Sequence, residues 1–274
     1  MQSNNPVLSR APQFTGGGYA GFDERGASRG PATGYGPSYS PSPQPSLEDM
    51  YAAPSATPVQ TGRMTYDDVV VRTGLTLAVV LAGAAVGWFG DPLLWIVGGV
   101  AGLVLGLVNA FKREPSPVLI MAYAAAQGLF LGGISSLYEA RFNGIVFQAV
   151  VATFATFGVM LALYRSGRIR ATARFQKILS GAIMGYAIFC LINLGILLFT
   201  GAGIRGGFFG LVIGAIGAVL AALSFVLDFE FVQQGVRNGI PQRYAWTAAF
   251  GLVVTLIWLY IELLRILSIL RSED

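Results

Sequence analysis

The chain has 274 residues, 54% of them hydrophobic and 12% charged, and its mean hydropathy is +0.62. A water-soluble domain carries roughly 25% charged residues, so this composition excludes an ordinary soluble globular protein. The absence of histidine removes the commonest general base and metal ligand, and the net charge of +4 gives no reason to expect a nucleic-acid partner.

Residues 1–62 are rich in Gly, Pro and Ser, as in TGGGYAGFDERGASRGPATGYGPSYSPSPQPS. A segment with so few aliphatic side chains cannot bury enough apolar surface to offset its ordering entropy, so we predict a disordered tail. No apolar stretch lies near Met1, so a secretory signal is not expected. The amphipathic stretch MTYDDVVVRTG follows, and its paired Asp67 and Asp68 are interpreted as surface charge.

Seven apolar segments come next, each long enough to cross a membrane. A span needs about 20 apolar residues to cross a hydrocarbon core of about 30 Å. The predicted spans are 73–90, 92–111, 117–138, 145–164, 177–199, 206–232 and 246–269. We therefore predict an all-α membrane protein in which residues 63–274 form a compact bundle of seven transmembrane helices, with the last helix central.

Basic residues are unequally divided between the two sets of loops. One set of flanks holds Arg63, Arg72, Lys112, Arg113, Arg165, Arg168, Arg170, Arg174, Lys177, Arg237 and Arg243. The opposite set holds Arg141, Arg205, Arg265 and Arg271. Because basic residues favour cytoplasmic loops, we predict that the N-terminus is cytoplasmic and the C-terminus outside.

Small residues recur every four positions in several spans, a spacing that lets a neighbouring backbone approach closely. The series are Gly206, Gly210, Gly214, Ala218 and Ala222; Gly98, Gly102 and Gly106; Gly83 and Gly87; and Gly128 and Gly132. The pattern predicts a tightly packed bundle and not a wide pore.

Ionisable side chains within the spans are the candidates for function, because each costs about 2.5–3.5 kcal/mol at the bilayer centre. Asp228 and Glu230 lie near the cytoplasmic end of the sixth span, and each is interpreted either as a proton-responsive or cation-coordinating carboxylate or as an interfacial acid. Glu262 lies in the seventh span, with Arg265 on the same face. That pair indicates either a structural ion pair or a functional carboxylate tuned by the arginine. Glu139 lies at the outer end of the third span.

Enzyme classes find little support in this sequence. Without histidine there is neither a zinc-protease motif nor a Ser–His pair. Lys112 and Lys177 lie at span ends, so a Ser–Lys dyad and a retinal Schiff base are not expected either. The single cysteine, Cys190, cannot form an internal disulfide. We predict no catalytic site, no bound metal and no cofactor.

The last third of the chain resembles the Bax inhibitor-like (transmembrane Bax inhibitor motif) family, in its bacterial, actinobacterial-type branch. The matching segments are GLFLGGISSLYE at 128–139, FVLDFEF at 225–231 and the C-terminal LYIELLRILSILRSED. Their order and spacing, together with the seven spans and basic flanks, extend the resemblance to about 73–274. It implies a protein of the bacterial plasma membrane, surrounded by lipid.

The resemblance also implies a pH-sensitive calcium leak. In that family an acid of the sixth span and one of the seventh share a proton, so that the pair titrates as a unit, and a basic residue after the second span partners one of them. Carried over, Asp228 takes the sixth-span role, and Lys112 or Arg113 that of the basic partner. Matching LYIE puts Glu262 in the seventh-span position, whereas a match of the final residues without a gap puts Thr255 there. On the predicted boundaries Glu262 would differ from Asp228 by about 20 Å in depth, too far for a shared proton.

Two functions therefore stay open. The first is a cation (calcium) leak channel gated by protonation of buried carboxylates. The second is a non-conducting interaction protein that modulates a membrane protease or a stress response, which the tail and the basic loop RSGRIRATARFQK suggest.

Overall fold

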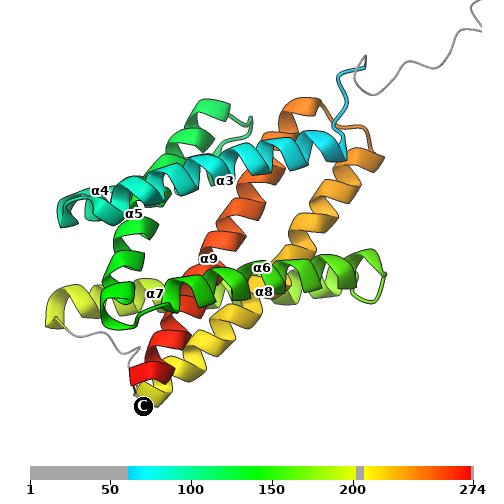
Figure 1. The fold of residues 1–274 in the computed structure, drawn as a ribbon. Coiled ribbons are helices and arrows are strands. Elements are labelled where there is room, and N and C mark those ends of the chain that lie inside the picture. Colours follow the sequence, from blue (N-terminus) through cyan, green and yellow to red (C-terminus); the bar gives the residue numbers. More distant parts are fainter. Residues whose placement is uncertain (1–60, 202–206, 273–274) are drawn as a thin grey trace, which may run out of the picture. The chain divides into compact units, whose positions relative to one another are not determined.

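The computed structural model describes residues 61–201 and 207–272, so nearly all of the tail predicted for residues 1–62 lies outside the described part. Figure 1 shows the arrangement of the helices. They are α3 (Tyr66–Phe89), α4 (Pro92–Phe111), α5 (Pro117–Arg141), α6 (Ile145–Arg165), α7 (Ala173–Thr200), α8 (Gly207–Arg237), the short 3-10 helix η2 (Gln242–Tyr244) and α9 (Ala245–Ser272). Seven of them are long and apolar enough to cross a membrane, and no strand occurs in the described ranges. The predicted all-α membrane fold is confirmed.

Local capping chemistry moves two helix starts upstream of the predicted spans. α3 begins at Tyr66 because Thr65 and Asp68 form a capping box. The Asp68 N–H donates to Thr65 Oγ1 (3.1 Å), and the Thr65 N–H donates to Asp68 Oδ2 (3.0 Å), which satisfies two donors that a helix start leaves open. α7 begins at Ala173 because the Thr172 hydroxyl accepts from the Phe175 N–H at 3.2 Å.

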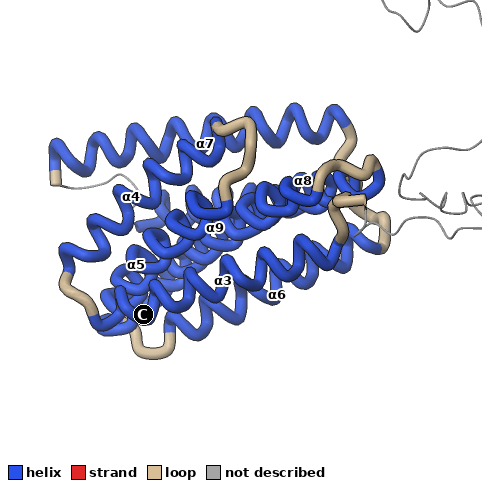
Figure 2. Tube along the Cα trace, turned by 90° about the horizontal axis from the view of Figure 1, so that it is seen from above, coloured by secondary structure: helices blue, strands red, loops and turns tan. Residues whose placement is uncertain are grey.

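The last helix lies at the centre of the bundle (Figure 2). It packs against α8, α3, α6 and α5, and its Val253 and Leu259 are almost completely buried. The largest core cluster forms where α8 meets α9, around Phe225 and Leu252. The predicted central position of the last helix is confirmed. At the edge of the bundle, α7 packs mainly on α8 and buries few of its side chains.

Glycines let α3, α4 and α5 approach at backbone distance. A Cβ atom added to Gly83 of α3 would lie 2.7 Å from the carbonyl oxygen of Ala125, and one added to Gly98 of α4 would lie 2.7 Å from that of Ala126. A Cβ atom on Gly132 of α5 would overlap the carbonyl group of Ala84. The close packing predicted from these glycine series is confirmed.

The stripe of small residues in α8 differs from the predicted one. Gly210 and Gly214 are buried as expected, but the buried line then continues through Gly217 and Ala221, while Ala218 and Ala222 are only partly buried. An α-helix has 3.6 residues per turn, so a strict four-residue series drifts away from one packed face. Gly206 lies outside the described residues.

The α3–α5 contact leads to a prediction for stability. Gly132→Ala should lower the free energy of unfolding by about 1–3 kcal/mol, the usual cost of overpacking, because the added methyl group meets the backbone of Ala84. The matched control is Gly158→Ala on α6, where an added Cβ meets nothing within 4 Å, so the gain in helix propensity should leave it neutral or slightly more stable. Thermal unfolding in detergent measures both. Equal melting temperatures for the two variants would contradict the close approach.

Candidate functional site

Asp228 of α8 points at α9, inside the contact between the two helices. The Thr255 hydroxyl donates to Asp228 Oδ2 at 2.7 Å. A Cβ atom on Gly251, one turn before Thr255, would lie 3.0 Å from Asp228 Oδ1, so this glycine makes room for the carboxylate. Thr255 is 6% exposed and Asp228 is partly buried. Asp228 is not among the ion pairs formed within residues 61–201 and 207–272.

Aromatic side chains hold this part of α8 against its neighbours. Phe225 and Phe229 stack on each other, with ring centroids 6.0 Å apart. Phe157 of α6 packs against both rings, at 5.2 and 5.7 Å. Since Asp228 adjoins Phe229 in the sequence, the rings fix the segment that carries the carboxylate.

The structure brings Asp228 to Thr255 and not to Glu262. The ungapped match of the C-terminus pointed to Thr255, which lies one heptad, or about 10 Å of helix, before Glu262. The Glu262 carboxyl carbon lies 2.9 Å from the position of a Cβ atom on Gly217, about 16 Å along α8 from Asp228. The side chain of α9 in contact with Asp228 is therefore a hydroxyl and not a second carboxylate.

Glu262 belongs to a second polar cluster, which joins α7, α8 and α9. Its side chain is 4% exposed, and its carboxylate accepts from the Tyr186 hydroxyl at 2.6 Å and pairs with the guanidinium of Arg265. Gly217 of α8 leaves space for the tyrosine hydroxyl, which an added Cβ atom would overlap. Arg265 Nε is buried without a hydrogen-bond partner in the described structure. The cluster contains an intrahelical ion pair, as the first reading of Glu262 and Arg265 supposed.

The basic residues predicted to partner Asp228 lie on the loop after α4. Lys112 and Arg113 are both exposed, and neither forms an ion pair within the described ranges. On the same loop Glu114 pairs with Arg243 at 3.3 Å, with both side chains mostly exposed. A partnership of Lys112 or Arg113 with Asp228 stays a prediction.

The other acids have local partners. Glu230 accepts from the Tyr164 hydroxyl and from Gln234 Nε2, both at 2.9 Å. Glu139 accepts from the N–H groups of Gly144 and Val146, at 2.5 and 3.1 Å. These are open donors at the start of α6, where a carboxylate also suits the helix dipole.

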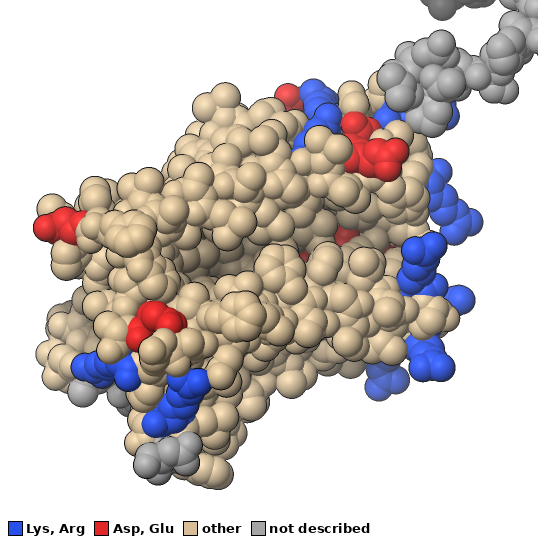
Figure 3. Space-filling view, in the orientation of Figure 1, with Lys and Arg blue, Asp and Glu red and all other residues tan. Residues whose placement is uncertain are grey.

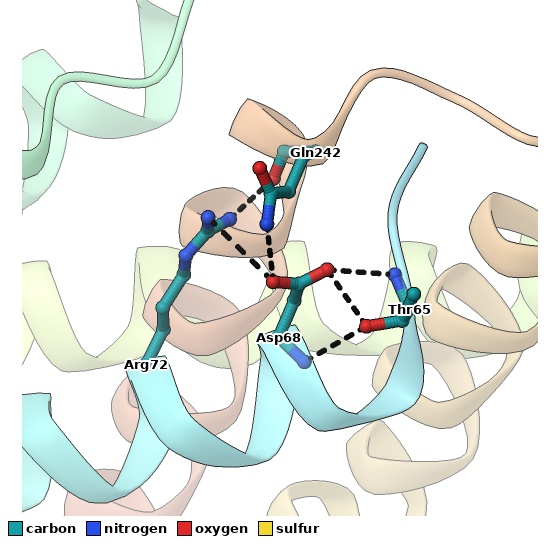
Figure 4. Close-up of polar contacts among 4 residues, drawn as sticks. All are labelled: Thr65, Asp68, Arg72 and Gln242. Carbon is teal, nitrogen blue, oxygen red and sulfur yellow. Dashed lines mark hydrogen bonds and ion pairs between the residues drawn. The ribbon is translucent and has the colours of Figure 1, made fainter. Parts of the chain in front are cut away.

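A polar cluster at the start of α3 was not foreseen from the sequence (Figure 4). Asp68 accepts from Gln242 Nε2 at 2.6 Å and lies 3.9 Å from the guanidinium of Arg72. That guanidinium donates to the Gln242 carbonyl oxygen and stands 5.5 Å from the ring centre of Trp246. The cluster ties the start of α3 to the α8–α9 turn.

The interpretation of Asp68 as surface charge is wrong, because its side chain is 17% exposed. Asp67 is exposed, as predicted. The spacing of Thr65 and Asp68 is the capping-box signature and could have indicated the local part of the cluster. The contact with Gln242 joins residues 174 positions apart, and no local pattern predicts it.

Among the described residues, no three or more His, Cys, Asp or Glu side chains form a group that could bind a metal ion. Asp228, Glu230 and Glu262 are thus single carboxylates with hydroxyl, amide or guanidinium partners.

The Glu262 cluster generates a prediction. Glu262→Leu should destabilise the protein by about 3–5 kcal/mol, because it leaves the guanidinium of Arg265 buried without its counter-charge. The double variant Glu262→Leu/Arg265→Leu removes both charges and should be closer to the wild type. Thermal unfolding of both variants in detergent measures the difference. A double variant at least as unstable as the single one would contradict a buried, mutually dependent pair.

Comparison with known proteins gives a family. The model of the family described as Bax inhibitor 1 like matches residues 5–272, nearly the whole chain. No curated protein matches the chain.

Proposed function

The chain is a multi-pass membrane protein of the Bax inhibitor 1 like family, and we propose that it is a cation leak channel, with calcium as the permeant ion, which responds to protonation of Asp228. The observation that supports this most is the contact of Asp228 with Thr255 within the α8–α9 interface. Here a carboxylate within a membrane span has a hydroxyl, and no basic side chain of the described residues, as its partner.

Such a carboxylate needs other stabilisation. Among apolar side chains a carboxyl group must be protonated, hydrogen-bonded or paired with a cation. Thr255 supplies one hydrogen bond to Oδ2, and the remaining lone pairs can exchange between a proton and a passing cation. This is the chemistry that a proton-responsive cation path requires.

We assign the described conformation to a closed state. Buried apolar side chains lie next to Asp228 and Thr255 along the two helices, among them Phe225, Phe229 and Leu256. An ion could pass only if α8 and α9 separate. Gating requires a part of the protein that can adopt two conformations, and we assign that role to this pair of helices. Glu262 would act at the other end of the same interface, where its contacts join α7, α8 and α9.

Thr255 changes the expected form of the pH response. Two carboxylates in contact release their protons in two coupled steps, whereas one carboxylate beside a hydroxyl releases a single proton. The flux of this protein should therefore follow a one-proton titration curve.

We also propose that the end of the bundle that carries Arg165, Arg170 and Arg237 faces the cytoplasm of a plasma membrane, as the excess of basic residues there favours. In a Cys190→Ser background, a membrane-impermeant maleimide applied to intact cells should label Ser272→Cys and not Ser166→Cys. Both serines are exposed in the structure. Labelling of Ser166→Cys alone would reverse the orientation.

Asp228→Asn should abolish the pH dependence of calcium flux, because an amide cannot exchange the proton. The assay uses the full-length protein in liposomes loaded with a calcium dye, between about pH 6 and 8. Glu230→Gln is the matched control, since this acid lies two residues further along α8 with its own partners, and it should keep the pH dependence. Flux that is absent at every pH, or unchanged in Asp228→Asn, would contradict the channel and favour the non-conducting interaction protein.

Thr255→Asp should restore a two-carboxylate contact, since the hydroxyl that it replaces lies 2.7 Å from Asp228. The pH profile of the flux should broaden into two steps, because two adjacent carboxylates titrate together. Thr255→Ser keeps the donor and should retain the one-proton curve. An unaltered profile in Thr255→Asp would show that the side chain at position 255 does not act on the titrating group.

A further inference from the structure

A pocket of about 1040 Å³ lies at the end of the bundle where α3 begins and where α6 and α8 end. Its volume is at the upper end of the range of about 300–1,000 Å³ that is usual for ligand sites. The apolar part of the lining includes Val69, Val70, Phe157, Leu161 and Phe229. The lining includes neither Asp228 nor Thr255. It shares with the proposed ion path only the packed rings of Phe157 and Phe229.

The pocket arises because α3 and α6 both pack on α9 but not substantially on each other. α8 closes the bottom of the gap with Phe229 and Val232. In the space-filling view a hollow lies between the ridges of α3 and α6, and basic side chains gather near its end (Figure 3). The gap is therefore open toward the side of the bundle that would face lipid.

Three arginines line the outer part of this pocket: Arg165 at the end of α6, Arg170 on the following loop and Arg237 at the end of α8. All three are exposed, and none forms an ion pair with a carboxylate of the described residues. The one acid of the lining, Glu230, already accepts hydrogen bonds from Tyr164 and Gln234 on its two oxygens. Among the residues that the structure describes, the rim thus carries an excess of positive charge.

The basic rim and the apolar wall of the pocket complement an amphiphile that has an anionic head group and a hydrocarbon tail. From Arg165 to Phe157 the lining extends along two turns of α6, about 12 Å. The interfacial region of a bilayer is roughly 5–7 Å thick on each side of a hydrocarbon core of about 30 Å, so a pocket of this depth extends from the head-group level into the acyl chains. Guanidinium groups bind phosphate oxygens through paired N–H donors, and basic pockets between transmembrane helices bind anionic lipid head groups.

We propose that this pocket binds one anionic phospholipid from the adjoining leaflet. The phosphate lies among Arg165, Arg170 and Arg237, and the first part of an acyl chain lies against Val69 and Leu161 between α3 and α6. The lipid fills the gap that the two helices leave open and offsets part of the positive charge of the rim. This site does not depend on whether the protein conducts ions.

Native mass spectrometry of the full-length protein in detergent tests the site, with phosphatidylglycerol and phosphatidylcholine of identical acyl chains as probes. Phosphatidylglycerol should bind saturably at one lipid per chain and at least about tenfold more tightly than phosphatidylcholine, since each arginine near an anionic head group strengthens binding by roughly fivefold. This comparison uses the wild type alone and does not depend on whether any variant folds. Equal retention of the two lipids would overturn the proposal.

Two matched triple variants locate the charge. Arg165→Gln/Arg170→Gln/Arg237→Gln removes the rim and should weaken binding of phosphatidylglycerol on the order of a hundredfold. Arg168→Gln/Arg174→Gln/Lys177→Gln removes the same charge from the neighbouring loop and α7, outside the lining, and should leave binding unchanged. Equal losses in the two variants would show diffuse surface attraction and overturn the site.

The apolar wall has a separate test. Leu161→Trp keeps every arginine and fills the pocket, so it should also weaken binding of phosphatidylglycerol severalfold. Binding that is unaffected by Leu161→Trp, or that millimolar inorganic phosphate removes completely, would show that only the phosphate is recognised at the surface. Either result would overturn a lipid site with an acyl wall.

Discussion

The α8–α9 contact is the interaction on which the rest of the bundle depends. α9 provides the surface on which α3, α5 and α6 also pack, so the position of α8 against it fixes the centre of the protein. Two polar contacts bracket this interface: Asp228 with Thr255, and the cluster of Glu262, Arg265 and Tyr186 about 16 Å further along α8. Each of these groups would be expensive to expose to hydrocarbon without its partner.

The helices on either side differ in how firmly they are held. Since lipid tails are as apolar as the side chains, association of helices in a membrane depends on close packing and on polar contacts. Glycines such as Gly83 and Gly132 bring α3 and α5 to backbone contact, and Asp68 and Gln242 fasten the start of α3 to the α8–α9 turn. α7 has fewer such contacts, and Tyr186 is one of its two buried side chains. Movement of α8 relative to α9 would therefore disturb α7 more easily than the α3–α5 unit.

Properties that depend on local pattern could be predicted from the sequence. The spans follow from runs of apolar residues, and the glycine contacts of α3, α4 and α5 follow from a four-residue spacing. The sequence could not show whether Thr255 or Glu262 contacts Asp228. That contact depends on the axial offset between α8 and α9, which the sequence of neither helix determines alone. The contact of Asp68 with Gln242 could not be predicted either, because the two residues lie 174 positions apart. The burial of Gly217 was missed because an α-helix has 3.6 residues per turn and not four.

The most direct test of the central claim is a double-mutant cycle on the pH dependence of calcium flux, with Asp228→Asn, Thr255→Val and the combined variant in the same liposomes. If the hydroxyl of Thr255 acts through the carboxylate of Asp228, Thr255→Val changes the pH profile of the wild type and has no further effect on Asp228→Asn. Coupled residues in contact deviate from additivity by about 0.5–3 kcal/mol. Effects of the two substitutions that simply add would contradict the claim that this contact is the pH-responsive element.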